Sequence, residues 1–143
     1  MISMKKLIFM AFVLLFAGLN AAAQTEEDKI KEPLLKYIDA TTNGKPQLLK
    51  EAFHADWNMY GITPEGTLRV TPGTTYYGYI QEGRKSNREC KIISIEYTEN
   101  IAQAKLEVLI PGGVLFTDYF TLAKIDGTWK ILHKFVHRKN LTE

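Results

Sequence analysis

Residues 116–138 read FTDYFTLAKIDGTWKILHKFVHR, and this stretch decides the fold. Two runs rich in aromatic and β-branched residues flank the step Asp126-Gly127. An Asp-Gly step between alternating runs is the strongest short-range signal for a β-hairpin, because a type I′ turn needs positive φ at both of its central residues. We therefore predict two antiparallel strands joined by a two-residue turn.

The side chains of these two strands divide between two faces, because residues two apart point to the same side of a strand. One face of the first strand carries Phe116, Asp118, Phe120 and Leu122. One face of the second strand carries Trp129, Ile131, His133, Phe135 and His137, and the other carries Lys130, Lys134 and Arg138. A two-residue turn pairs Asp118 with Phe135, which makes His133 and His137 diagonal neighbours of the carboxylate, about 7–8 Å away. A β-bulge would slip this pairing by one residue.

The first 23 residues resemble a secretory signal peptide. They combine the basic start Lys5-Lys6, an apolar run from Leu7 to Leu19 and the small residues Ala21-Ala22-Ala23. The run is shorter than the roughly 20 residues of a membrane span, although an uncleaved anchor helix is the alternative. We expect residues 1–23 to be removed, residues 24–143 to form a single domain, and the mature protein to be periplasmic or secreted.

Charge and cysteine content exclude several classes of function. The formal charge of +2 comes entirely from Lys5 and Lys6, so the mature domain is neutral and gives no support for nucleic-acid binding, nor for membrane association after cleavage. Cys90 is the only cysteine and cannot form an internal disulfide; a buried, inert thiol is expected. No spacing typical of a metal site and no phosphate-binding glycine loop is evident, so we expect no metal and no cofactor.

Helical patterns precede the strands. Apolar residues at helical spacing predict a helix around Ile30–Ile38, capped by Thr25 and ended by Asn43-Gly44, and Pro46 opens a second short helix. A third helix is expected within Thr74–Gly83, weakened by Gly78. Strands are expected around 57–61, 68–71, 90–98 and 101–110. This order predicts an α+β domain with helices on one face of a curved sheet, and such a sheet leaves a cavity at its open end.

Three segments carry a family resemblance: Phe53-His54-Ala55-Asp56, residues 116–122, and Asp126-Gly-Thr-Trp129-Lys-Ile131. Together with the order of elements, they resemble the cone-shaped α+β fold of nuclear transport factor 2-like proteins. Within it, residues 30–138 are most similar to the SnoaL-like proteins and the "putative lumazine-binding" group. The resemblance implies about three N-terminal helices packed on a curved, mainly antiparallel sheet, and a homodimer formed through the outer face of that sheet. Two departures are Ala55, where relatives often have Pro, and the Tyr- and Gly-rich segment 74–84.

Asp118 and His133 are the candidate catalytic residues. A carboxylate on an apolar face is costly unless it is paired, and an Asp–His pair can move protons near neutral pH. The alternative is a structural Asp bonded to His133 or to the backbone. Candidate ligand-binding residues are His54, Tyr60, Tyr76, Phe116, Phe120, Trp129 and Phe135. Core filling is the alternative for the aromatic residues, and the alternative for His54 is a protonated imidazole favoured by the end of the preceding helix.

Three hypotheses about function follow from these residues and this resemblance. The first is an exported domain that binds a small apolar or aromatic molecule without turnover. The second is a SnoaL-like or ketosteroid-isomerase-like enzyme doing acid–base chemistry on a small carbonyl compound. The third is a non-catalytic module for dimerisation or interaction, whose cone is filled by its own Phe and Tyr side chains.

Overall fold

The computed structural model describes residues 24–141, and the predicted signal peptide lies outside this range. In chain order, the described elements are α2 (Glu26–Asn43), α3 (Pro46–Ala52), β1 (Phe53–Ile62), β2 (Leu68–Pro72), α4 (Gly73–Tyr77), β3 (Glu89–Thr98), β4 (Ile101–Ile110), β5 (Val114–Ile125) and β6 (Thr128–Asn140). None of the helices in this range is long and apolar enough to span a membrane.

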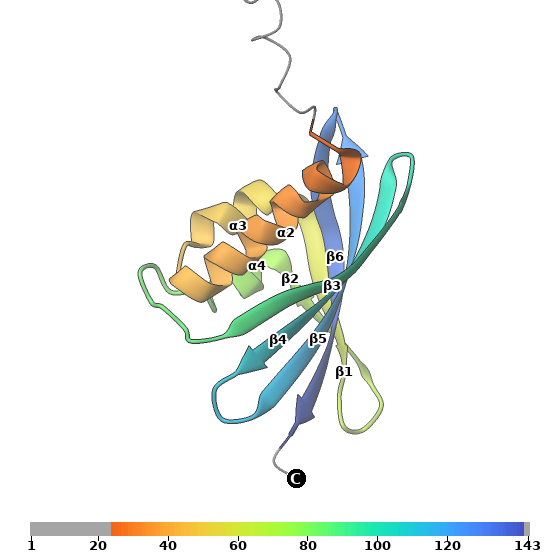
Figure 1. Cartoon of the computed structure of the whole chain (residues 1–143). Helices are drawn as coiled ribbons and strands as arrows, with labels where there is room; N and C mark the ends of the chain where they lie inside the picture. Colours follow the sequence, from red (N-terminus) through yellow and green to blue (C-terminus); the bar gives the residue numbers. More distant parts are fainter. Residues whose placement is uncertain (1–23, 142–143) are drawn as a thin grey trace, which may run out of the picture.

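The strands form a six-stranded sheet in the order β2-β1-β6-β5-β4-β3. Neighbours are antiparallel except β1 and β6, which run parallel. Figure 1 shows α2 and α3 side by side on one side of the twisted sheet, which we call the inner face, while the β1–β2 hairpin and the end of β6 extend beyond the helices. The predicted α+β architecture is confirmed.

The helix boundaries follow the local sequence signals. Thr25 caps α2 in a capping box with Asp28, and Gly44 ends the helix with φ at 65°. A Cβ at Gly44 would lie 2.5 Å from the backbone of Arg84, so only glycine fits there. The third helix is shorter than predicted. It ends at Tyr77, because Gly78 follows directly and favours a cap over another turn.

The core lies between the helices and the inner face of the sheet. Its largest fully buried side chains come from both layers: Trp57, Tyr37, Phe120, Ile30, Leu34, Leu49, Leu106, Leu122, Ile131, Val108 and Asp118. Edge-on packing of Tyr37 against Phe120, with ring centroids 5.0 Å apart, joins α2 to β5. Aromatic side chains therefore fill much of the cone beneath the helices.

The β5–β6 hairpin follows its predicted register only near the turn. Asp126 and Gly127 both have positive φ, at 48° and 77°. Pairing runs as predicted from Ile125–Thr128 to Leu122–Ile131, and then shifts so that Thr121 pairs with His133. The extra residue is Leu132, which forms a β-bulge.

Relative to the predicted register, the bulge moves every following residue of β6 to the opposite face of the sheet. Lys134 is buried beside Asp118 on the inner face, whereas His133 and Phe135 lie on the outer face with Tyr60. The prediction that His133 shares a face with Asp118 while Lys134 lies on the opposite face was wrong. Alternation assumes one residue per pairing position, and a bulge places two residues on one strand opposite one on the other.

Candidate functional site

A buried triad of polar side chains joins α2, β5 and β6 inside the cone. The carboxylate of Asp118 accepts hydrogen bonds on Oδ2 from the Tyr37 hydroxyl at 2.9 Å and from the Lys134 ammonium at 3.0 Å. The Lys134 ammonium also donates to the Tyr37 oxygen at 2.8 Å. These three residues are each no more than 3% exposed. Paired in this way, a buried charge is tolerated at modest net cost.

Aromatic rings surround the Lys134 ammonium. Its nitrogen lies 4.8 Å from the ring centroid of Tyr37, 5.1 Å from that of Tyr76 and 5.8 Å from that of Phe120, within the range of cation–π attraction. Burial alone lowers the pKa of Lys134, but Tyr76 and Asp118 raise it, and the net pKa lies above the ordinary value for lysine. Lys134 is therefore a cation at neutral pH.

The remaining two members of the triad have complementary states. Burial, followed by the charge of Asp118, raises the pKa of Tyr37 well above its ordinary value, so the phenol stays neutral and acts as a donor. Asp118 Oδ1 is buried and has no hydrogen-bond partner within the described part of the chain. The triad thus holds one carboxylate oxygen firmly and leaves the other as an open acceptor.

The expected pair of Asp118 and His133 does not form, because the bulge turns His133 to the outer face. There its ring packs edge-on against Tyr60 at 5.9 Å. His137 pairs with Thr117, also on the outer side of the strand. His54 lies at the start of β1, where its Nδ1 accepts a hydrogen bond from the Asp56 backbone at 3.3 Å. Lys134 therefore takes the position beside Asp118 that sequence reasoning gave to a histidine.

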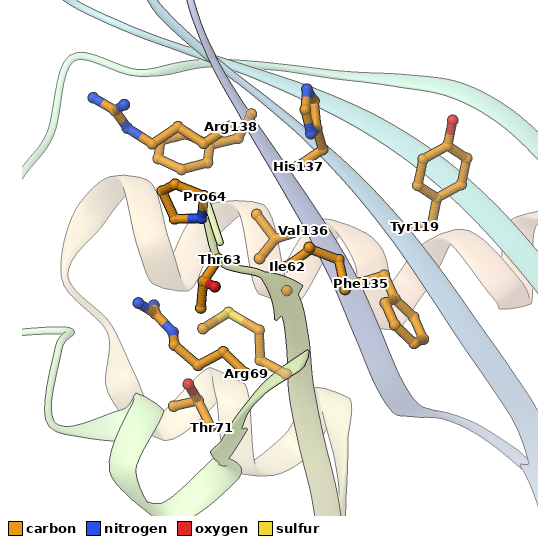
Figure 2. Close-up of a pocket in the computed structure, with 13 residues that line it drawn as sticks. Ile62, Thr63, Pro64, Arg69, Thr71, Tyr119, Phe135, Val136, His137 and Arg138 are labelled. Carbon is orange, nitrogen blue, oxygen red and sulfur yellow. The ribbon is translucent and has the colours of Figure 1, made fainter. Parts of the chain in front are cut away.

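A cavity of about 680 Å³ is lined by residues from the end of β1, the start of β2, the start of β5 and the end of β6. We call this region the open end. Figure 2 shows its lining residues. They are Met59, Gly61, Ile62, Thr63, Pro64, Arg69, Thr71, Phe116, Tyr119, Phe135, Val136, His137 and Arg138.

The strand register places the cavity next to the triad. Along the inner face of β6, Lys134 is followed by Val136 and then by Arg138 towards the open end. The parallel strand β1 places Met59 beside Lys134 and Gly61 beside Val136. Met59 and Val136 line the cavity, so the cavity begins one inner-face position beyond the triad. Because Gly61 has no side chain, its position leaves room in the cavity wall.

The candidate ligand-binding residues are divided among three environments. Phe116 and Phe135 line the cavity. Tyr60 stacks on Phe135 at 4.9 Å, and His54 lies outside the cavity lining. The side chains buried in the core are Tyr76, Phe120 and Trp129. Sequence reasoning missed Lys134, Arg69, Arg138 and Gly61. Only Lys134 had a signal, as a lysine in an apolar strand paired with the strand that carries Asp118.

Comparisons with known proteins identify the family. Residues 25–137 match the model of the family described as "Putative lumazine-binding". The chain belongs to this family. Solved structures with a similar fold include that of an NTF2-like protein of unknown function from Shewanella baltica OS155. The match has 24% identity, covers 84% of this chain and 98% of that chain, and has a TM-score of 0.73. An NTF2-like protein of unknown function from Methylobacillus flagellatus KT is 25% identical, over 85% of this chain and 97% of that chain, with a TM-score of 0.71.

A curated relative adds a second point of comparison. The protein named "Aldolase FrzH", from Cladobotryum sp, is 27% identical over 116 residues, which span 79% of this chain and 91% of that protein. The chain is thus a nuclear transport factor 2-like domain of the "Putative lumazine-binding" family, with both a cavity and a buried polar triad beside it.

Proposed function

We propose that this domain binds a small, largely apolar molecule in the cavity at the open end. The observation that carries the proposal is the cavity itself. Its volume of about 680 Å³ lies within the range of roughly 300–1,000 Å³ typical of small-molecule sites. Met59, Phe116 and Val136 supply apolar walls on the inner face, and the family's description as "Putative lumazine-binding" supports a small-molecule ligand.

The proposal can be tested with N-phenyl-1-naphthylamine, a neutral aromatic probe that becomes fluorescent in apolar sites. The wild-type protein should bind it saturably. Gly61→Leu should weaken binding about tenfold or more, because the added side chain grows into the cavity. A Cβ at Gly61 would meet Val136 at an ordinary 3.4 Å, so the variant should fold. Ala55→Leu, on the same strand but outside the cavity lining, is the matched control. Equal binding by the Gly61 variant and the wild type would rule out this site.

The alternative function is acid–base chemistry on a small carbonyl compound. The buried triad favours it, and the relative named aldolase is consistent with it. Asp118 Oδ1 is an open acceptor for a proton next to a carbonyl. The Lys134 ammonium has three N–H groups and makes two hydrogen bonds in the triad, so its third N–H is a donor that would stabilise a developing oxyanion.

This alternative has a direct test. Proton NMR in D₂O would follow exchange of the α-hydrogens of cyclohexanone, with wild-type protein and with Asp118→Asn. Exchange faster than in buffer that the variant abolishes would support catalysis. No acceleration by a correctly folded wild-type domain would contradict catalysis on this compound class and leave the binding function standing.

We further propose that the mature domain is exported and forms a homodimer through the outer face of the sheet. Val70, Tyr119 and Phe135 on that face are 47%, 52% and 46% exposed, respectively. Strand pairing places them in one row with Tyr60, and a contiguous exposed apolar patch is typical of an interaction site. Sedimentation of the mature protein should give a dimer, and Val70→Asp, outside the cavity lining, should shift it to monomer. Intact mass of the exported protein should correspond to a chain that starts at Gln24.

A further inference from the structure

We propose that the ligand of this cavity carries an anionic group, and that Arg69 and Arg138 bind it. The inference rests on the proposed binding function and specifies the ligand class: an aromatic or apolar acid, such as a carboxylate, sulfonate or phosphate ester. Its basis is the charge of the cavity lining, which is independent of the cavity's volume.

The cavity lining carries positive charge that no carboxylate of the lining neutralises. It contains Arg69 and Arg138, and none of its residues is an Asp or Glu. Low-dielectric walls that carry one sign of charge concentrate a ligand of the opposite sign. Since the mature domain as a whole is neutral by sequence, this positive charge is a local property of the cavity.

The guanidinium groups of both arginines lack an ion-pair or hydrogen-bond partner within residues 24–141. Elsewhere in the same range, cationic side chains commonly pair with carboxylates. Lys31 contacts Glu27 at 2.7 Å, Lys36 contacts Glu51 at 2.9 Å, and Lys124 contacts Glu26 at 2.7 Å. The donors of Arg69 and Arg138 are therefore available for a ligand.

The two arginines reach the cavity from different strands. Arg69 on β2 pairs with Gly61 of β1, and Arg138 on β6 pairs with Phe116 of β5. Figure 2 shows their guanidinium groups extending to the same side of the cavity, with Thr63 and Pro64 between them. The gap left by Gly61 lies in the wall next to Val136.

This arrangement suits a ligand with two chemically different ends. A planar guanidinium donates two parallel hydrogen bonds to a carboxylate, sulfonate or phosphate. The apolar part of such a ligand would contact Phe116 and Val136, which line the same cavity. A neutral molecule would use the apolar walls and leave both arginines without partners.

The test compares two probes that share a ring system. 1-Anilinonaphthalene-8-sulfonate carries an anionic sulfonate, and N-phenyl-1-naphthylamine is its neutral counterpart. The wild-type protein should bind the sulfonate about tenfold more tightly, and added salt should reduce that preference. Arg69→Gln combined with Arg138→Gln should abolish the preference and change binding of the neutral probe by less than about twofold. Both arginines are exposed, so the variant should keep its circular dichroism spectrum.

A second double variant controls for net charge. Arg84→Gln with Lys91→Gln removes the same two positive charges from exposed positions outside the cavity lining, and it should retain the sulfonate preference. The inference is overturned if the wild type binds both probes equally, or if the arginine variant and the control behave alike. If the wild type binds neither probe, the proposed function itself is overturned.

Discussion

Strand β6 presents two cations, Lys134 and Arg138, to the inner face in opposite environments. Lys134 is 3% exposed and bonded to Asp118 and Tyr37. Arg138 is exposed, lines the cavity and has no ion-pair partner within the described residues. The comparison shows two roles for a cation on the inner face. A cation that donates hydrogen bonds to a carboxylate and a phenol has a structural role, whereas a cation without such acceptors is available to a ligand.

The largest effect is expected at the buried cation. Lys134→Met leaves Asp118 as a buried carboxylate without its counter-charge, which should lower the free energy of unfolding by ~3–5 kcal/mol. Urea denaturation would measure this loss. Combining it with Asp118→Leu removes both charges and should recover much of the stability. A loss below about 1 kcal/mol in the single variant would show that the pair contributes little.

A smaller loss is expected at the phenol that completes the triad. Tyr37→Phe keeps the ring contacts with Phe120 but removes the hydroxyl that donates to Asp118. Loss of one hydrogen bond to a charged group should cost roughly 1.5–3 kcal/mol in urea denaturation. If Tyr37→Phe is as stable as the wild type, Lys134 alone satisfies the carboxylate.

Glu26, a half-buried residue that anchors α2 to the sheet, should have an intermediate effect that depends on pH. Hydrogen bonds from Lys124 and then Trp129 lower the pKa of Glu26 from 4.5 to about 2. Because the pKa is lower in the folded state, the stability that Glu26 contributes is fully present above pH 4.5 and is lost as the pH falls towards 2. Glu26→Gln should therefore flatten the dependence of the urea midpoint on pH in this window. An unchanged pH profile would contradict the anchor.

The smallest effect on stability is expected at the open end. Like Lys134→Met, Arg138→Met replaces a cationic side chain with methionine on the same strand and face. It should alter the free energy of unfolding by less than about 0.5 kcal/mol. Its effect should appear instead in binding of the anionic probe. A stability loss comparable to that of Lys134→Met would mean that Arg138 has a structural role.

Signals local in sequence predicted most of the fold. The capping box at Thr25, the stop at Gly44 and the Asp126-Gly127 turn are determined by one or a few neighbouring residues, and each was identified correctly. The shortened α4 shows the limit of this reasoning, since five residues of helix depend on contacts with β1 and β2 rather than on their own propensity.

The site was harder to predict because it depends on pairing distant in sequence. The segment around Leu132 alternates well enough to conceal a bulge, and this one residue decides whether Lys134 or His133 lies beside Asp118. The arginines of the cavity gave no signal, because Arg69 and Arg138 meet at one end of the sheet only through the order β2-β1-β6-β5.

Because of the bulge at Leu132, the same sequence has two possible sets of inward-facing residues in β6. In a regular strand of the same sequence, His133, Phe135 and His137 would face inward in place of Lys134, Val136 and Arg138. Opening or closing one bulge would thus exchange an imidazole-lined interior for a cationic one without changing any of these amino acids. For an evolving family, a change in the pairing of one residue would be a short route between two kinds of site within the same fold.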